Sequence, residues 1–478
     1  MTWIDTSILL AYLVMLIALG IYALRKQETV EDYYLAGRRL GPVTIACLWM
    51  ASWVGGASIV GSSSRAFELG ITSVWYIAAI ALGCLVFGLT MAARIKQESD
   101  EHAHFTFPDY LEHRFDAKTR LVSTIVMMIS FVAVSAGQLV AAAAILQVLL
   151  GWEFHLALIV AAAVVVGYTA VGGYLAVTYT DWMQFTLLLV GLVVVGMPIA
   201  IAKTGSWADL RAALPAAQFD LGASGWGNIV SLVASIVMSF YVSMDSYTRC
   251  YAARDPQAAR NGALLAVLFI IPMAISATWL GLSAAVLFPE AQVADGILTV
   301  FVLETFPVGL KGLVLVAILA AIMSSADICI LSASANYSKD LHARFISPGM
   351  EEGAILRLGI GASVVIGLLA LLMAWTLQDI IGLLQISFTV LSASLFIPIT
   401  LATFRKQVNP TATFWSVCLS LITVIAWRTA QGFGAAGWFQ IDPLYPGLLI
   451  SGVSLALVCA LSADQRPTGS ARGLSEFP

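Results

Sequence analysis

Oxygen-bearing groups inside apolar segments are the first candidates for chemistry in this sequence. Gly55 and Gly56 lie side by side within the apolar run 41–64. Adjacent glycines weaken a helix and expose backbone carbonyl oxygens, which are hard ligands suited to a small cation such as Na+. Glycines also let two membrane helices pack closely. These two residues alone therefore leave a cation site and a packing contact as alternatives.

A second group of oxygens lies in the apolar run 308–340. Ser324 and Ser325 offer adjacent hydroxyl groups. Asp327 projects from the same helical face as Ser324, because it follows three residues later. A carboxylate at membrane depth is costly and indicates a functional site. This run is therefore predicted to carry polar chemistry.

Two further residues stand out by their position. Asp181 ends the segment GGYLAVTYTD (172–181), which is predicted to form a polar turn before an apolar span. The aspartate there fits a helix cap as well as a functional site. Trp53 lies too deep in its apolar run for the interfacial belt that explains most membrane tryptophans. We interpret it as the wall of a pocket.

The elements that position these residues are membrane helices. Of the 478 residues, 60% are hydrophobic and 11% charged, and the mean hydropathy is +0.91. This composition predicts an all-α integral membrane protein in the lipid bilayer. We count about thirteen spans of roughly 20 residues, near 4–24, 41–64, 70–94, 121–150, 156–174, 182–202, 229–249, 261–288, 308–340, 355–375, 379–404, 411–430 and 444–462. The prediction is one polytopic domain over 1–464 and a short cytoplasmic tail over 465–478.

The distribution of positive charge predicts the orientation in the plasma membrane. The first apolar run has its positive charges, Arg25 and Lys26, after it, so it is a retained span and not a signal peptide. With the N-terminus outside and the C-terminus cytoplasmic, about nineteen of the 24 lysines and arginines fall on the inner side. The outer five are Arg65, Lys203, Arg211, Lys311 and Arg428.

Several protein classes are disfavoured by composition and motifs. The net charge is −4 and the sequence has no basic block, so nucleic-acid binding is not indicated. No nucleophile, base and orienting group converge at membrane depth, and no phosphate loop is present, so we expect no enzyme. The six scattered cysteines are interpreted as packing residues. His102, His104 and His113 share a charged loop, which is interpreted as solvated and not as a metal site.

Five segments together resemble one known family, the sodium:solute symporters. They are DYYLAGR (32–38), GGYLAVTYTD (172–181), TRCYAARDPQAARNG (248–262), AAIMSSAD (320–327) and LSASANYSKDL (331–341). They occur in the family's order and with family-like spacing from about residue 30 to 400. WVGG (53–56) and AAIMSSAD look most similar to the high-affinity choline transporters.

The resemblance implies a fold and a cation site. The fold is a five-plus-five inverted-repeat core, with repeats at about 41–202 and 229–404 and a broken second span. Na+ would be held by the carbonyl oxygens of Ala51, Val54 and Ala321 and by the hydroxyls of Ser324 and Ser325. Asp181 matches an aspartate on the cytoplasmic side of that site. Asp327 stands where some members coordinate a second sodium with hydroxyls, so it could bind Na+, carry a proton or satisfy a neighbouring amide.

The resemblance also implies a solute pocket formed by Trp53, Ser58, Ser243 and Asp245. Asp245 could pair with an amine, which suggests a cationic or zwitterionic solute such as an amine, an amino acid or a choline-like compound. The alternative for Asp245 is an ion pair with Arg249 on the next helical turn. The implied activity is sodium-coupled import of a small organic solute by alternating access.

Other interpretations remain at this point. A monocarboxylate or vitamin-like anion is the alternative cargo, for which Arg65 at the outer end of the second span argues. A transporter-like membrane sensor is the alternative from another class, although a signalling domain is not evident. The sequence does not indicate an oligomeric state.

Overall fold

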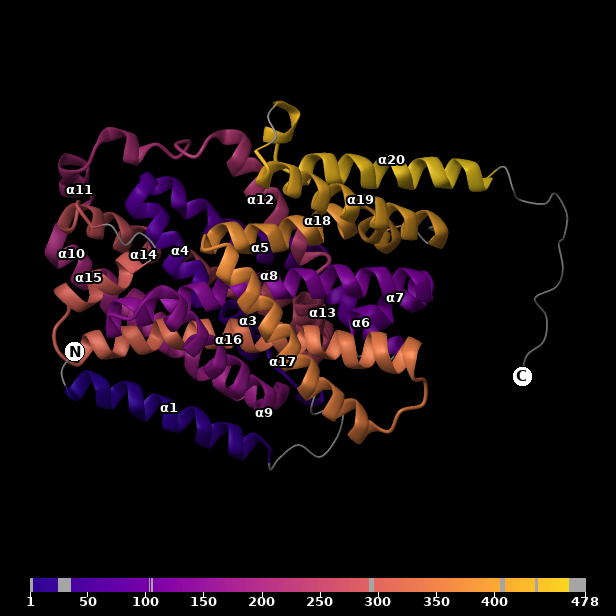
Figure 1. The fold of residues 1–478 in the computed structure, drawn as a ribbon, viewed down its shortest axis with the longest axis horizontal. Coiled ribbons are helices and arrows are strands. Elements are labelled where there is room, and N and C mark those ends of the chain that lie inside the picture. Colours follow the sequence, from indigo (N-terminus) through magenta and orange to yellow (C-terminus); the bar gives the residue numbers. More distant parts are fainter. Residues whose placement is uncertain are drawn as a thin grey trace, which may run out of the picture.

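The computed structural model describes residues 3–24, 36–102, 104, 106–291, 296–404, 409–434 and 437–463. Within these ranges the chain is helical, without a β-strand. The helices form an elongated bundle in which α8, α16 and α20 run along the long axis (Figure 1). Part of the DYYLAGR segment (residues 32–35) and the tail 465–478 lie outside the described residues.

The longer α-helices follow the predicted apolar runs, and shorter α-helices lie in the connections between them. In chain order they are α1 (Trp3–Leu24), α3 (Pro42–Trp53), α4 (Gly56–Leu69), α5 (Val74–Thr90), α6 (Ala92–His102), α7 (Phe107–Arg114), α8 (Ala117–Leu150), α9 (Phe154–Leu188), α10 (Met197–Thr204), α11 (Trp207–Ala213), α12 (Trp226–Phe240), α13 (Met244–Ala252), α14 (Pro256–Leu287), α15 (Ile297–Thr305), α16 (Leu310–Ala335), α17 (Glu352–Thr376), α18 (Ile380–Phe404), α19 (Pro410–Gly432) and α20 (Leu444–Ala463). Two π-helical stretches, η3 (Leu189–Gly196) and η6 (Asn336–Ile346), extend α9 and α16.

Length and composition identify membrane spans among these helices. Within the described residues, nine helices are long and apolar enough to cross a membrane, or up to ten if the bent pair α12 and α13 is one span. Large apolar side chains such as Leu372 on α17 and Ile422 on α19 are more than 60% exposed, as expected of helices that face lipid. The chain is therefore a multi-pass membrane protein. The number of thirteen spans and the inverted repeat stay predictions.

The turn predicted over GGYLAVTYTD falls inside helix α9. The spans predicted at 156–174 and 182–202 share the helical run α9, η3 and α10. No proline occurs between residues 154 and 188, so no residue there lacks the N–H that a helix needs. Glycines are tolerated in membrane helices, since a lost backbone hydrogen bond is costly in lipid.

The predicted break in the second span is confirmed. Helix α3 ends at Trp53, Val54 has φ −104° and ψ 61°, and α4 starts after Gly55. A second break, which the sequence analysis did not predict, separates α12 from α13 with a bend of 41°. It covers residues 241–243, where Ser243 leads into α13. Each of two separate spans is thus interrupted within the membrane-spanning part of the bundle.

The two broken helices are joined by their main chains at one end. The backbone N–H of Leu40, just before α3, donates to the carbonyl of Ala252 at 3.1 Å. The N–H of Arg254 donates in return to the carbonyl of Leu40 at 2.9 Å. These bonds form an isolated parallel bridge between Leu40 and Ala253.

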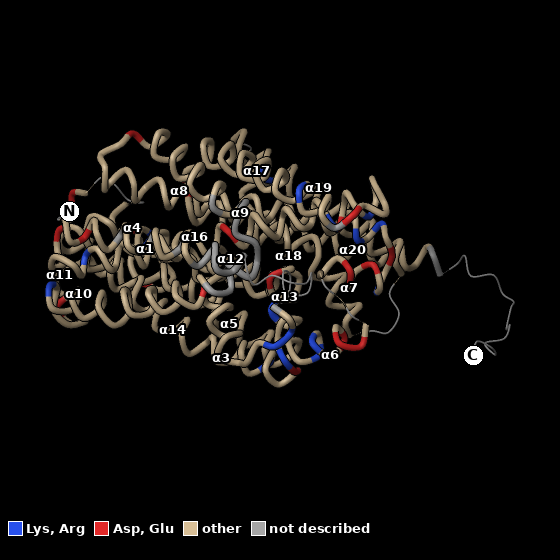
Figure 2. Tube along the Cα trace, turned by 90° about the horizontal axis from the view of Figure 1, so that it is seen from below, with Lys and Arg blue, Asp and Glu red and all other residues tan. Residues whose placement is uncertain are grey.

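Helix α16 is the most enclosed of the candidate spans. Of its most apolar window, 89% is buried, against 28% for α17. Charged residues gather towards the two ends of the bundle, one near α6 and α7 and the other near α10 and α11, while the middle is largely uncharged (Figure 2). The charged side chains buried in the middle of the bundle, on α9, α13 and α16, are therefore exceptions in a largely uncharged interior.

Candidate functional site

Five oxygen atoms converge where α16 passes the break between α3 and α4. The Ser324 hydroxyl lies 3.2 Å from the carbonyl oxygen of Ala51 and 3.0 Å from that of Ala321. The Ser325 hydroxyl lies 3.2 Å from the Ala51 carbonyl and 3.3 Å from that of Ser52. All five residues except Ser52 are buried. Two hydroxyl hydrogens serve four contacts, so lone pairs are in excess, which favours a small cation.

Most of the sequence-predicted sodium ligands are brought together in this cluster. Ala51, Ala321, Ser324 and Ser325 belong to it, as the preceding distances show. Val54 is fully buried at the break itself, and its carbonyl remains a predicted ligand. The carbonyl of Ser52 is an additional member that sequence reasoning missed.

Gly55 and Gly56 are required by the close approach of α16. Gly55 has φ −74° and ψ 175°, which is extended backbone open to any residue. A Cβ atom on Gly55 would lie 1.9 Å from the Ser325 hydroxyl oxygen. A Cβ on Gly56 would lie 2.1 Å from the Ile322 side chain and 2.7 Å from its backbone nitrogen. Close packing, one of the two alternatives posed from sequence, is therefore confirmed, and the cation site stays a prediction.

The broken backbone is stabilised from α8. The first turn of α4 leaves N–H groups without partners inside the helix. The side-chain carbonyl of Gln138 accepts a hydrogen bond from Ala57 N–H at 3.0 Å. The Ser58 hydroxyl bridges the break by donating to the Trp53 carbonyl at 3.3 Å. Gln138 was not singled out from sequence, although it is a polar residue within an apolar run.

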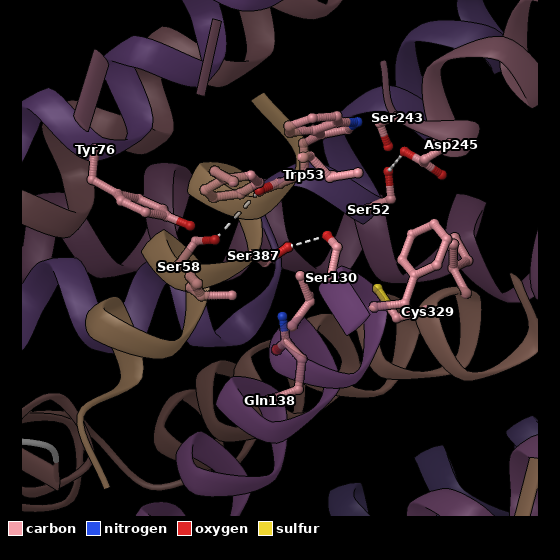
Figure 3. A pocket seen from close by; sticks show the side chains of 16 residues that line it. Ser52, Trp53, Ser58, Tyr76, Ser130, Gln138, Ser243, Asp245, Cys329 and Ser387 are labelled. Atoms are coloured by element: carbon pink, nitrogen blue, oxygen red, sulfur yellow. Dashed lines mark hydrogen bonds between the residues drawn. The ribbon is translucent and has the colours of Figure 1, made fainter. Parts of the chain in front are cut away.

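A cavity adjoins the oxygen cluster and contains all four predicted pocket residues. Its volume is about 50 Å³, which is below the usual range for small-molecule sites, so the cavity has to widen to hold a solute. Trp53, Ser58, Ser243 and Asp245 line it. Figure 3 shows serine hydroxyls and Gln138 around this space, with aromatic rings along another side. Ser52, Tyr76, Ser130, Cys329, Ser387 and Phe388 are among the lining residues that were not predicted.

Stacked aromatic rings form one wall of the cavity. The Trp53 ring stacks on Phe240 with centroids 3.7 Å apart and on Phe388 at 5.8 Å. Phe240 in turn stacks on Trp49 at 5.3 Å. The buried indole N–H of Trp53 has no hydrogen-bond partner among the described residues. The predicted role of Trp53 as a pocket wall fits this position.

Asp245 forms the ion pair with Arg249 that was posed as its alternative role. One carboxylate oxygen contacts the Arg249 guanidinium, and the other accepts the Ser52 hydroxyl at 3.0 Å. Arg249 is fully buried and lies 6.0 Å from the ring centre of Trp49. Asp245 still borders the cavity, so its negative charge is present there but largely compensated.

The other two predicted acids lie outside the five-oxygen cluster. Asp181 on α9 is fully buried, and neither of its carboxylate oxygens has a hydrogen-bond partner among the described residues. Asp327 on α16 is 1% exposed and contacts the hydroxyl of Thr169 on α9. The two acids interact electrostatically.

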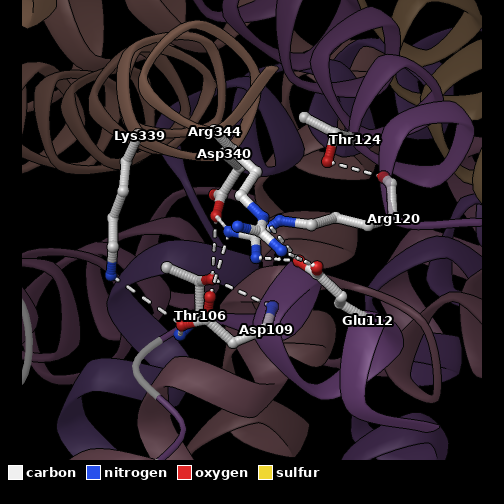
Figure 4. Close-up of polar contacts among 8 residues, drawn as sticks. All are labelled: Thr106, Asp109, Glu112, Arg120, Thr124, Lys339, Asp340 and Arg344. Carbon is white, nitrogen blue, oxygen red and sulfur yellow. Dashed lines mark hydrogen bonds and ion pairs between the residues drawn. The ribbon is translucent and has the colours of Figure 1, made fainter. Parts of the chain in front are cut away.

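A network of ion pairs joins α7, α8 and η6 at the α7 end of the bundle (Figure 4). Arg120 pairs with Glu112 at 2.6 Å, with Asp109 at 3.0 Å and with Asp340. Burial raises the pKa of Glu112, but the positive charges of Arg344 and Arg120 outweigh it, so that the pKa lies below its usual value. This network stabilises one end of the helices that frame the site.

The three histidines of the charged loop come together without forming a metal site. Their ring centres lie 4.2 to 5.6 Å apart. Among the residues that the structure describes, no group of three or more potential ligands is arranged to hold a metal ion. His104 is buried, so the prediction of a wholly solvated loop is wrong for it. Burial lowers the pKa of His104 to about 4.

A bundle of membrane helices with two interrupted spans beside a central cavity is the architecture of many membrane transporters. A family model described as "Sodium:solute symporter family" matches residues 33–420. The chain belongs to the sodium:solute symporter family, and it is a transporter and not an enzyme.

Individual relatives carry different solutes. The osmoregulated proline transporter OpuE of Bacillus subtilis is 25% identical over 468 residues, covering 94% of this chain and 93% of that protein. The sodium/pantothenate symporter of Escherichia coli is 24% identical and covers 93% of both. A solved Na+-coupled sialic acid symporter, in a substrate-bound outward-open state, has a TM-score of 0.80 at 20% identity, covering 99% of this chain and 100% of that one.

Proposed function

We propose that this protein imports a small organic solute together with Na+ by alternating access. The observation that carries the proposal is the five-oxygen cluster at the break between α3 and α4. Na+ bound by Ala51, Val54, Ala321, Ser324 and Ser325 would link a broken helix to the enclosed helix α16. This link would hold the broken helix and α16 in one relative arrangement. When the ion leaves, the two helices would be free to adopt another.

The ion provides the driving force. Each Na+ that enters gains about 2.3 kcal/mol per 100 mV of membrane potential, in addition to its concentration gradient. Ser52 connects the five-oxygen cluster to the cavity. Its carbonyl belongs to the cluster, and its side chain lines the cavity. Sodium binding therefore organises residues that also contact the solute.

The cavity favours a zwitterion, such as an amino acid with an apolar side group. The rings of Trp53 and Phe388 suit the apolar part, and the serine hydroxyls with the Trp53 N–H suit a carboxylate. An ammonium group would face the partly compensated charge of Asp245. The proline cargo named for OpuE has this chemistry. Binding of amines and choline-like cations is less favoured, because Arg249 already neutralises Asp245.

An anionic cargo is the second candidate, supported by the pantothenate symporter among the relatives. The residues lining the central cavity include no lysine, arginine or histidine. Arg65, which argued for an anion, is paired with Asp379 at 3.1 Å. The cavity lining therefore offers an anion no cationic side chain, which makes this candidate the weaker one.

The proposal includes the topology predicted from sequence. The chain would cross the plasma membrane thirteen times, with an outer N-terminus, a cytoplasmic C-terminus and inverted repeats at about 41–202 and 229–404. Two features support the repeats, since each of them opens with a broken helix, α3 with α4 and α12 with α13. In this arrangement the ion-pair network of Figure 4 faces the cytoplasm, and Asp181 attracts the departing cation.

The test is uptake by purified protein in proteoliposomes, with and without a sodium gradient, for proline, other amino acids, amines and monocarboxylates. We expect sodium-dependent uptake of an amino acid. Replacing both Ser324→Ala and Ser325→Ala removes two ligands to an ion, each worth about 1.5–3 kcal/mol. The sodium concentration for half-maximal uptake should rise by roughly tenfold or more.

A matched control replaces a buried serine remote from the break. The Ser420 hydroxyl contacts the carbonyls of Ala393 and Gly447 at 2.8 Å, and Ser420→Ala should keep the wild-type sodium requirement. An unchanged sodium requirement in the double variant would remove the cation site as drawn here. Uptake independent of sodium for every solute would refute the proposed coupling.

A further inference from the structure

Two hollows near the C-terminal end of α19 are larger than the central cavity. One has a volume of about 370 Å³ and the other about 550 Å³, and both fall within the usual range for small-molecule sites. The two hollows adjoin, because Gln385, Arg428, Gln431, Asp442 and Pro443 line both of them. The larger hollow shares no lining residue with the central cavity. It is therefore separate from the solute pocket.

The larger hollow is a mainly apolar groove formed by α17, α18 and α19. Val390 on α18 and Val424 on α19 line it and are buried. Leu377, just after α17, and Ile425 on α19 also line it, but they are 43% and 46% exposed. The groove therefore opens to the outside of the bundle. All three helices are candidate membrane spans, so this opening faces lipid.

The groove runs from the end of α19 towards the middle of the membrane. Its lining residues on α19 extend from Gly432, the last residue of the helix, back to Val424. At about 1.5 Å per residue this stretch is about 12 Å long. The hydrocarbon layer of one leaflet is about 15 Å thick. The groove thus has the length and the lining to hold an acyl chain.

Arg428 provides a positive charge at the end of the groove nearest the membrane surface. It lies one helical turn before the end of α19 and donates a hydrogen bond to the side-chain oxygen of Gln431 at 3.2 Å. Among the described residues this is its only hydrogen-bond partner, and none of their carboxylates lies within ion-pair distance of it. A guanidinium group has five N–H donors. Most of them are therefore available to a phosphate group, which arginine binds well.

Asp442 provides a negative charge at the same end. The Gln431 side chain donates to the carbonyl of Ile441 at 3.1 Å, so it links Arg428 to the segment that carries Asp442. The Asp442 carboxylate accepts the side-chain amide of Gln385 at 3.1 Å and the N–H of Leu444 at 2.9 Å. Both partners are neutral. This end of the groove therefore offers one cation and one anion, which is complementary to a headgroup with a phosphate and an ammonium group.

We propose that the groove binds a membrane phospholipid with a zwitterionic headgroup, such as phosphatidylethanolamine. One acyl chain would lie between α17 and α19, the phosphate would contact Arg428 and the ammonium group would face Asp442. A small water-soluble solute would leave the apolar part of the groove unfilled. A lipid with a glycerol headgroup would lack the ammonium group. Because the groove is separate from the solute pocket, this inference does not rest on the proposed function.

The test is native mass spectrometry of the purified full-length protein in detergent. Phosphatidylethanolamine and phosphatidylglycerol with the same acyl chains are added separately, and we expect tighter binding of phosphatidylethanolamine. Arg428→Gln should lower its affinity roughly tenfold or more, because a charged hydrogen bond is lost. The matched control is Arg211→Gln on α11, another exposed arginine, which lines neither hollow and should keep the wild-type affinity.

A second pair of variants tests the apolar part of the site. Ile425→Trp puts a bulky ring into the groove and should weaken binding of both lipids. Ile422→Trp is its control, because Ile422 lies on the same helix, is 62% exposed and does not line the groove. Thermal unfolding in detergent without added lipid checks that all variants are folded.

Three results would overturn the proposal. The first is wild-type affinity for phosphatidylethanolamine in Arg428→Gln or in Ile425→Trp. The second is binding of phosphatidylglycerol as tight as that of phosphatidylethanolamine. The third is displacement of the lipid by proline or another water-soluble solute, which would assign the groove to the solute. The measurements need neither sodium nor transport, so their failure is distinguishable from failure of the proposed symport.

Discussion

A methyl group at Gly55 is the sharpest perturbation of the candidate cation site. In Gly55→Ala the added carbon would start 1.9 Å from the Ser325 hydroxyl oxygen. Van der Waals contact needs about 3.4 Å, so one of the atoms must move by roughly 1.5 Å. The Ser325 hydroxyl can rotate away, which removes it from the Ala51 and Ser52 carbonyls. The Ser325 Cβ would still lie 2.7 Å from the added carbon, so α4 and α16 must also shift slightly apart. The fold should survive while the oxygen cluster loses one member.

The magnitude follows from the cost of overpacking. Inserting a methyl group into a packed interior typically costs about 1–3 kcal/mol. If the overpacking destabilises the sodium-binding conformation by this free energy, the sodium affinity falls roughly 5- to 150-fold. The assay is binding of radioactive sodium to purified protein, together with the sodium dependence of uptake once a solute is known.

Two further glycines serve as comparisons. Gly41 directly precedes α3, as Gly55 precedes α4. A Cβ on Gly41 would meet nothing within 4 Å, so Gly41→Ala should behave as wild type. Gly56→Ala would press on the backbone nitrogen of Ile322 and the carbonyl of Ile318, so it should lower thermal stability as α4 and α16 separate. A Gly55→Ala protein with wild-type sodium affinity would refute the argument that these close contacts build a cation site.

The remaining predictions concern buried and interfacial charges. Asp245→Asn should lower the free energy of unfolding by about 3–5 kcal/mol, because it removes the carboxylate that pairs with the buried Arg249. Thermal unfolding measures this loss, and a melting temperature equal to that of the wild type would contradict the ion pair. Glu112 has a pKa lowered by Arg344 and Arg120, so it stabilises the folded state above its ordinary pKa and loses that effect as the pH falls through the lowered value. Acidification should therefore lower the melting temperature of the wild type more steeply than that of Glu112→Gln, and parallel pH profiles would contradict this.

The break at the second span was predictable from sequence, but its local cause was not. Gly55 and Gly56 indicated a weakened helix, and the structure does interrupt the helix there. The backbone angles at Gly55 are nevertheless open to any residue. Glycine is needed because Ser325 lies against it, and this contact joins residues 270 positions apart in the chain. Spacing along a sequence does not report which faces of distant helices meet.

The same reason explains the residues that were missed. Phe240 and Phe388 reach the site from α12 and α18, and each looks ordinary within its own apolar run. Gln138 on α8 is polar within an apolar run, but the sequence does not show which backbone group it contacts. The break before Ser243 had a weak signal, since Ser243 and Asp245 place polar groups within the apolar run 229–249. The family resemblance singled out Ser324 and Ser325, which the structure places beside the Ala51 carbonyl, because a resemblance carries information on three-dimensional contacts. Periodicity and composition alone do not contain it.

The backbone bridge between Leu40 and Ala253 makes the two broken helices partners in any motion. Its hydrogen bonds use only main-chain atoms, so side-chain substitutions leave them intact, whereas proline at position 40 or 254 deletes a donor. If α3 tilts, α13 is pulled along with it at this end. A movement of α3 at its contact with Ser325 would therefore also move α13, which carries Asp245 and Arg249. Most mutations and changes in the surrounding solution would leave this backbone linkage unchanged.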